Sequence, residues 1–152
     1  MNLSSDIALA HRLADVAGAV VAPYFRSGLQ SERKADASPV TLADRAAEEA
    51  MRTILTAEVP RDAVVGEELG DTGGETSRTW VLDPIDGTVS FLGGRPIFGT
   101  LIALLVEGFP VLGLIDQPIL GERWLGASGR ATTFNGDPVR SRSCRALDEA
   151  VL

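Results

Sequence analysis

The sequence is poor in cysteine and histidine and has no long hydrophobic run. Its 152 residues include one cysteine, Cys144, and one histidine, His11. A single cysteine excludes an internal disulfide framework, and no apolar stretch is long enough to span a bilayer. The first residues lack a basic region ahead of an apolar segment, so we expect no secretory signal and a cytoplasmic location.

Positive charge is also in short supply. The chain has 14 basic and 21 acidic residues, a net charge of −7. This balance disfavours nonspecific nucleic-acid binding, which needs cations facing phosphates. A phosphate substrate is still compatible with it, because bound metal ions reverse the local sign of charge. We therefore expect neither a nucleic-acid nor a membrane partner.

What the sequence does contain is enough apolar residues for a folded domain. The hydrophobic content is 45%, which suits a globular chain and argues against disorder. A chain of this length buries about 70% of its unfolded surface when it folds as one domain. We therefore expect a single domain over residues 1–152.

The N-terminal part predicts a first helix over residues 5–26, where apolar residues recur at helical spacing. Ser4 or Ser5 is the expected N-cap, and Pro23 bends or ends the last turn. His11 falls on the polar side of this helix, which predicts a surface residue.

A second helix is expected to begin after Thr41, its predicted N-cap, and to stop at Pro60. Asp44 then lies in the first turn, where the helix dipole favours a carboxylate. That position alone is a sufficient structural explanation for an aspartate.

The rest of the chain predicts a sheet. Glu107 and Gly108 indicate a hairpin turn, as do residues 118–121 and 135–137, and residues 71–77 read as a surface loop. Two helices followed by mostly antiparallel strands indicate an α+β fold, with the helices packed on the sheet. The predicted strands are residues 63–65, 79–82, 99–106, 110–115 and 122–126.

The most informative segment is residues 80–88, an apolar run followed by two carboxylates and a Gly-Thr turn. Asp83 and Asp86 flank a proline, and two acids this close repel each other unless a cation lies between them. Mg²⁺ prefers such oxygen ligands, completed by water and substrate phosphate. Gly87 and Thr88 are expected to open a helix that could receive a phosphate. The alternative is turn chemistry, because Asp-Pro and Asp-Gly are common turn dipeptides.

A second acidic element follows another β-branched run at residues 64–70. Glu67 and Glu68 come directly after Gly66, so two strand ends could hold two or more metals around a phosphoryl group. Taken alone, a Glu-Glu pair in a loop is usually solvated. The neighbouring acidic strand end favours Glu67 as a ligand and leaves Glu68 ambiguous.

The combined order and spacing of residues 66–68 and 83–88, with residues 34–44 upstream, resembles the inositol monophosphatase family of Mg²⁺-dependent phosphatases. The resemblance implies the sugar-phosphatase fold shared with fructose bisphosphatases, of which this chain covers the N-terminal domain. It also implies Mg²⁺ as cofactor, with two or three ions in the complete family site. The implied metal ligands are Glu67, Asp83, Asp86 and the main-chain carbonyl of Ile85.

The resemblance implies catalytic roles as well. Thr88 and Asp44 match the pair that orients and activates the attacking water, with Glu67 beside them. The amides of Gly87 and Thr88 would bind the phosphate. Lys34 is a further candidate for contact with the phosphate or a metal-bound water; the alternative is that it faces solvent, as loop lysines usually do. Attack would be direct, because no cysteine or serine near the motif is a persuasive nucleophile.

Within the family, residues 94–104, 115–118 and 122–124 look most like the histidinol-phosphatase branch, which acts in histidine biosynthesis. The alternative is an inositol monophosphatase or another small-molecule phosphatase. Either way the partner is a small phosphorylated metabolite, and the resemblance favours a homodimer. Arg95, Glu122 and Trp124 are expected to serve an interface or packing before substrate choice.

The resemblance covers only the N-terminal half or so of the family's length. Family members have a C-terminal α/β domain with a Trp-Asp motif that supplies a further metal-ligand aspartate, and no Trp-Asp pair occurs in this sequence. We therefore expect a truncated form lacking that domain. A catalytically silent metal-binding or interaction module is the second hypothesis, because losing a domain exposes apolar surface.

Overall fold

The computed structural model describes residues 2–28, 32–33, 39–144, 146, 148 and 150. The helices are α1 (Ser4–Val21), η1 (Ala22–Tyr24, a 3-10 helix), α2 (Leu42–Glu58) and α3 (Thr88–Leu92). The strands are β1 (Glu32–Arg33), β2 (Pro39–Val40), β3 (Ala63–Gly66), β4 (Gly70–Thr72), β5 (Arg78–Asp86), β6 (Gly99–Val106), β7 (Phe109–Gln117), β8 (Glu122–Ala127), β9 (Thr133–Phe134) and β10 (Asp137–Pro138). No helix in this described part of the chain is long and apolar enough to cross a membrane.

The strands form one large sheet and a small separate pair. The eight-stranded sheet has the order β10-β9-β8-β7-β6-β5-β3-β4, and β1 pairs with β2. Every pairing in the large sheet is antiparallel except that of β3 with β5. The predicted α+β fold, with two long helices on a mostly antiparallel sheet, is therefore confirmed.

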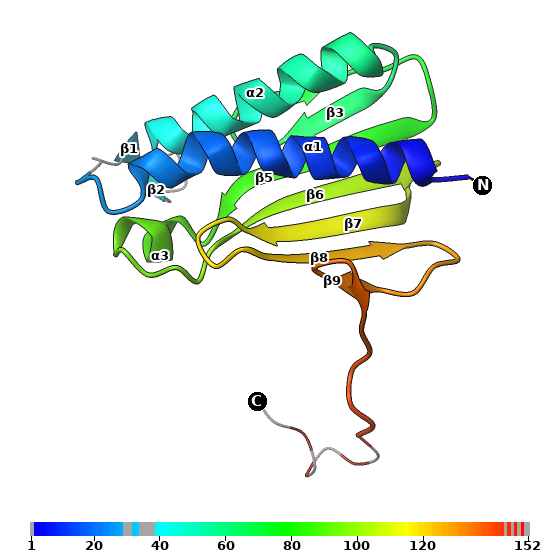
Figure 1. Cartoon of the computed structure of the whole chain (residues 1–152). Coiled ribbons are helices and arrows are strands. Elements are labelled where there is room, and N and C mark those ends of the chain that lie inside the picture. The colour runs from blue at the N-terminus through cyan, green and yellow to red at the C-terminus, as the bar shows by residue number, and fades with distance from the viewer. Residues whose placement is uncertain are drawn as a thin grey trace.

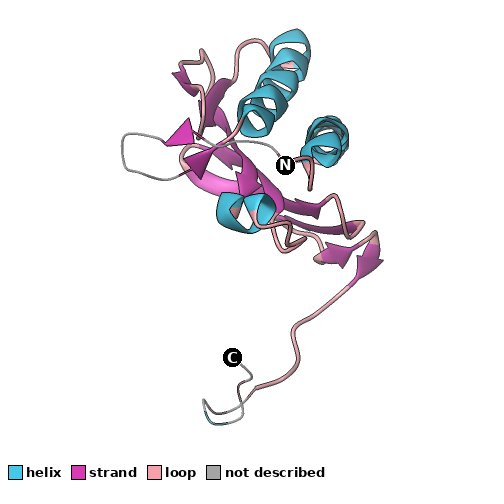
Figure 2. Cartoon of the chain, turned by 90° about the vertical axis from the view of Figure 1, so that its left-hand side faces the viewer, coloured by secondary structure: helices cyan, strands magenta, loops and turns pink. Residues whose placement is uncertain are grey.

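Both long helices cover the same face of the sheet. In Figure 1, α1 crosses β6 and β7 while α2 lies over β3 and β5, and Figure 2 shows both helices on one side. Buried side chains mostly alternate with less buried ones along β3, β5, β6 and β7, as a sheet with one covered face requires. Its largest fully buried side chain is Trp80, which packs in the core as expected and donates to Asp62 Oδ2 over 3.2 Å.

The start of α2 confirms the predicted cap at Thr41. Thr41 Oγ1 accepts from the amides of Ala43 (3.1 Å) and Asp44 (3.4 Å), and Asp44 Oδ2 accepts from the Thr41 amide over 2.9 Å. This reciprocal capping box satisfies amides that a helix end leaves without partners. The helix ends at Glu58, shortly before Pro60, as predicted.

Three local predictions were wrong. The first helix begins at Ser4 and neither serine caps it: Leu3 holds the N-cap position, and Asn2 Oδ1 accepts from the Ser4 amide over 3.1 Å. The helix also stops at Val21 rather than at residue 26 and tightens into a 3-10 turn. Pro23 ends the regular helix there, as predicted, because it has no amide hydrogen to donate. The expected loop over residues 71–77 begins instead with the last two residues of β4, which pairs with β3.

The hairpin between β6 and β7 forms where predicted. Glu107 and Gly108 both have positive φ (53° and 80°), as the tight two-residue turns of twisted hairpins require. The predicted turn at residues 135–137 joins β9 to β10, two short strands that the sequence did not predict.

Candidate metal centre

The parallel pairing of β3 and β5 brings the two predicted acidic elements together. Gly66 stands opposite Leu82 in the register, so Glu67 follows β3 beside the position where β5 reaches Asp83. The Glu67 amide donates to the Leu82 carbonyl oxygen over 3.2 Å, which fixes the backbone there. Because parallel strands end at the same edge of a sheet, residues 16 positions apart in sequence become neighbours.

Asp83 is held in an environment that disfavours its charge. Burial, a hydrogen bond and charge repulsion from Glu67, and the charge of Asp86 together raise the pKa of Asp83 to about 8, against a weaker opposing hydrogen bond from the Ile85 backbone. Its Oδ1 atom is buried without a hydrogen-bond partner in the described structure. Without a cation, the carboxyl groups of Asp83 and Glu67 are therefore expected to share a proton near neutral pH.

A bulge in β5 sets the direction of the second aspartate. Asp83 pairs with Leu101 and Asp86 with Gly99, so three steps along β5 match two steps along β6. In a regular strand, residues three apart face opposite sides of the sheet. The extra residue lets Asp83 and Asp86 stand opposite positions on the same face of β6, which brings both acids to one side.

The backbone after Asp83 is tied down by two hydroxyl groups. Thr100 Oγ1 donates to the Pro84 carbonyl oxygen (2.8 Å), and Thr88 Oγ1 donates to the Ile85 carbonyl oxygen (3.1 Å). Gly87 is the N-cap of α3 with φ 93°, a conformation that favours glycine. Thr88 therefore begins a helix, as predicted, with its hydroxyl fixed beside the Ile85 carbonyl.

The donor set fits a hard divalent cation. It contains carboxylates and a main-chain carbonyl but no sulfur or imidazole, which suits Mg²⁺, Mn²⁺ or Ca²⁺. The unpartnered Oδ1 atom and the raised pKa of Asp83 are what a cation would relieve. Asp86 is exposed beside the pair. Among the described residues, no three acidic, histidine or cysteine side chains are already grouped as a coordination shell.

The remaining predicted residues are placed unequally. Asp44 is buried at the start of α2, and that end lies near α3 because β2, just before it, contacts α3. Glu68 is half-buried in the turn after β3. Lys34 lies outside the described residues.

Several buried polar residues were missed or misjudged. The sequence pattern did not indicate Glu48, yet its side chain is fully buried between α2 and the turn after β3. His11 is half-buried rather than on the surface: its Nδ1 lies 3.2 Å from the Arg123 guanidinium, and burial, followed by that positive charge, lowers its pKa. Arg123 also bonds Asp15 (2.8 Å) and Asp116 (2.7 Å), joining α1 to the sheet.

Trp124 packs on Phe134, with ring centroids 4.8 Å apart, which confirms the packing role predicted for this tryptophan. Cys144 is exposed.

Comparison with known proteins decides the family. The sequence profile of the inositol monophosphatase family matches residues 2–152, essentially the whole chain. The chain belongs to the inositol monophosphatase family. The predicted resemblance is thereby confirmed.

Relatives support both the family and its phosphatase character. The chain is 53% identical over 153 residues to the chloroplastic bifunctional phosphatase IMPL2 of Arabidopsis thaliana, covering 99% of this chain and 44% of the relative. It is 44% identical over 139 residues to a histidinol-phosphatase of Chlorobaculum parvum, covering 91% of this chain and 54% of that protein. The chain spans about half the length of these relatives.

A solved structure supports the fold. An inositol monophosphatase from Zymomonas mobilis superimposes with a TM-score of 0.83 at 55% identity, over 97% of this chain and 57% of the other. At that similarity the family's arrangement of helices and sheet is the arrangement found here.

Proposed function

We propose that this chain forms the metal-binding part of a Mg²⁺-dependent phosphomonoesterase acting on a small phosphorylated metabolite, with histidinol phosphate as its substrate. The observation that carries the proposal is the contact of Glu67 with the half-buried Asp83 near the end of β5. Directly after it, the chain turns at Gly87 into Thr88 and α3. Histidinol-phosphatases among the relatives support the substrate assignment. An inositol monophosphate is the alternative substrate.

In this proposal Glu67, Asp83, Asp86 and the Ile85 carbonyl hold the cations. Bound divalent ions supply charge stabilisation to phosphoryl and leaving oxygens. Gly87 and Thr88 bind the phosphate through their amides, and Lys34 contacts it.

Two residues of this chain then orient and deprotonate the attacking water. Thr88 already donates its hydroxyl hydrogen to Ile85, so its oxygen lone pairs can accept a hydrogen bond from water. Asp44, held by the capping box, accepts the proton as water oxygen bonds to phosphorus. The ester P–O bond breaks, and the departing alkoxide takes a proton from solvent.

We also propose that residues 1–152 correspond to the N-terminal domain of the family, completed by a C-terminal α/β domain in the relatives' remaining length. We expect a cytoplasmic homodimer. The share of each relative that the chain covers supports the domain assignment.

Activity can be tested in a chimaera that joins this chain to the remaining C-terminal part of the Zymomonas mobilis relative. We expect Mg²⁺-dependent phosphate release that favours histidinol phosphate over an inositol monophosphate. Asp44→Asn should reduce turnover by about 100-fold, as expected for loss of a proton acceptor. Asp71→Asn, on the exposed strand β4, is the matched control.

Unchanged turnover in the Asp44→Asn chimaera would contradict the role given to Asp44. A folded chimaera that releases phosphate from neither substrate would favour the second candidate, an interaction module without catalysis.

An exposed apolar face of the sheet is the observation behind the second candidate, an interaction module. The sheet face opposite α1 and α2 carries Val81, Leu101, Ile115 and Trp124 around a shallow cavity of about 500 Å³. Ile115 is 47% exposed, and contiguous apolar surface of this kind usually contacts a partner. We propose that the family's C-terminal α/β domain covers this face.

The proposed cover can be tested with a hydrophobic dye and light scattering. The chain alone should enhance dye fluorescence or self-associate, because its apolar sheet face contacts water. The chimaera should bind little dye and should associate no further than the proposed dimer. A monomeric chain that binds no more dye than the chimaera would argue against this cover.

A further inference from the structure

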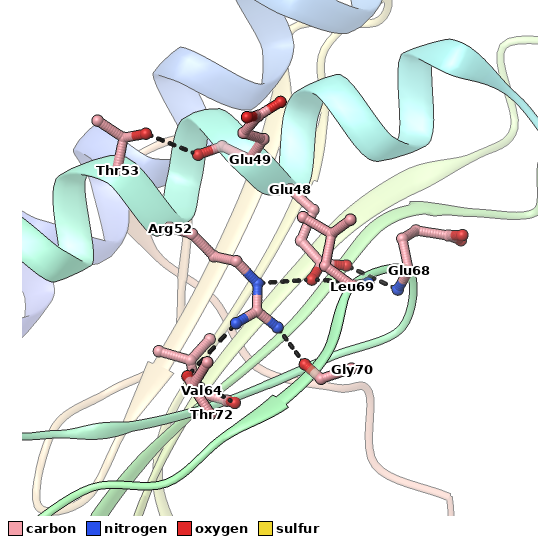
Figure 3. A network of polar contacts seen from close by, with 9 residues as sticks. All are labelled: Glu48, Glu49, Arg52, Thr53, Val64, Glu68, Leu69, Gly70 and Thr72. Atoms are coloured by element: carbon pink, nitrogen blue, oxygen red, sulfur yellow. Dashed lines mark hydrogen bonds and ion pairs between the residues drawn. The ribbon is translucent and has the colours of Figure 1, made fainter.

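Glu48 is an unusual residue for the interior of α2, a charged side chain with no exposed surface. An isolated buried carboxylate is costly unless hydrogen bonds compensate it. Its Oε2 atom accepts from the Glu68 amide over 2.7 Å, and its Oε1 atom accepts from the Leu69 amide over 3.2 Å (Figure 3). Both bonds cross from the helix to the turn that follows Glu67.

Arg52, one helical turn further along, completes the network. Its Nε atom donates to Glu48 Oε1 over 2.8 Å. Its two terminal nitrogens donate to the Gly70 carbonyl oxygen and to Thr72 Oγ1, the latter over 3.4 Å (Figure 3). The guanidinium thus neutralises Glu48 while it binds the far side of the same turn.

Gly66, directly before Glu67, leaves the space that this network needs. A Cβ atom built on Gly66 would lie 1.9 Å from Glu48 Oε1 and 2.5 Å from Arg52 Nη2. Any side chain at this position would push the Glu48 carboxylate away. The approach of the carboxylate to the backbone therefore depends on a glycine here.

Glu67 is consequently fixed on both sides. Its own amide bonds the Leu82 carbonyl oxygen, one residue before Asp83. The next two amides, of Glu68 and Leu69, bond Glu48. The distance between the Glu67 and Asp83 backbones is therefore set by β5 on one side and by α2 on the other.

The same helix also carries Asp44. Asp44, Glu48 and Arg52 follow at intervals of four residues, so they share one side of α2. Any shift of α2 would move Asp44 and the Glu67 turn together.

We propose that Glu48 and Arg52 are positioning residues, which hold the turn bearing Glu67 so that its carboxylate meets Asp83 in the geometry a divalent cation needs. This inference rests on the proposed metal-binding function. Neither residue touches the metal or the substrate.

The test compares Mn²⁺ affinities of the folded 152-residue chain by calorimetry. Glu48→Gln leaves every proposed ligand in place. Its new NH2 group, however, faces an N–H donor, either a backbone amide or Arg52, where the carboxylate oxygen accepted a hydrogen bond. We expect Mn²⁺ binding weaker by about 10- to 100-fold, the usual effect of losing residues that orient metal ligands. Glu49→Gln is the matched control, since Glu49 is exposed and its carboxylate points away from the network (Figure 3).

Arg52→Lys serves as a milder second variant, because it keeps the charge and loses the forked contacts to Gly70 and Thr72. It should weaken Mn²⁺ binding in the same direction, and it decides the matter if Glu48→Gln does not fold. Amide hydrogen exchange supplies a readout independent of metal: Glu68 and Leu69 should exchange faster in Glu48→Gln and unchanged in Glu49→Gln.

The outcomes separate this inference from the proposed function. Wild-type Mn²⁺ affinity in folded Glu48→Gln and Arg52→Lys, whatever their stability, would overturn positioning while the metal site stands. Absence of Mn²⁺ binding by the wild-type chain would overturn the proposed function and this inference with it.

Discussion

Asp83→Asn should weaken binding of Mg²⁺ or Mn²⁺ by about 100-fold or more, because even residues that only orient metal ligands are worth 10- to 100-fold. Asp83 is the central acid of the site, in contact with Glu67 and close enough to Asp86 to feel its charge. The substitution keeps the shape of the side chain and removes the negative charge that a cation would neutralise.

Calorimetric titration at pH 8 measures this effect directly. Asp71→Asn makes the same chemical change on exposed β4 and should leave the affinity unchanged. Equal cation affinities for the wild-type chain and Asp83→Asn would show that β5 does not carry the metal site.

Without metal, Asp83→Asn should make the folded chain more stable than the wild type at pH 8. The folded chain binds a proton at Asp83 up to about pH 8, whereas the unfolded chain loses it near the ordinary pKa of 3.8. Between these values the folded state holds more protons, so this group's contribution to the free energy of unfolding falls as pH rises. Asp83→Asn has no such group to titrate.

Urea unfolding of the metal-free proteins from pH 5 to pH 8 tests this sign. The wild-type chain should become less stable relative to Asp83→Asn by about 1–3 kcal/mol across the range, a figure reduced for the site's partial solvent access. Saturating Mg²⁺ at pH 8 should restore stability to the wild-type chain alone, since a ligand stabilises the state that binds it. If the free energies of unfolding of the two proteins changed with pH in parallel, the raised pKa of Asp83 beside Glu67 would be contradicted.

Much of this site could be predicted because strand ends and turn residues are local signals. Two strand ends are indicated by a β-branched run that ends in Gly66 and Glu67 and by an apolar run that ends in Asp83. Two strand ends that carry acids can share metal ions only if they lie side by side, and the parallel pairing of β3 with β5 brings them together. The cap at Thr41 and the glycine turn before Thr88 are equally local, and both formed where predicted.

The parts that sequence reasoning missed depend on contacts between distant residues. Glu48 and Arg52 are 20 or so positions from the turn they bind, and an acidic residue beside the apolar stripe of α2 was the only available signal. His11 looked solvent-facing because its partner Arg123 lies 112 residues away. The β5 bulge likewise depends on its partner strand β6, which no local pattern in residues 83–86 reveals.

Paramagnetic line broadening by substoichiometric Mn²⁺, followed residue by residue in an amide NMR spectrum, is the most direct measurement of where a metal binds. The strand-end site predicts that the amide signals of residues 66–69, 82–83 and 85–88 are lost first. The amide signals of the residues that line the acidic cavity around Asp15, Asp116 and Arg123 should remain at that Mn²⁺ concentration. Broadening centred on that cavity, or spread evenly over the acidic surface, would contradict a metal site built from Glu67, Asp83 and Asp86.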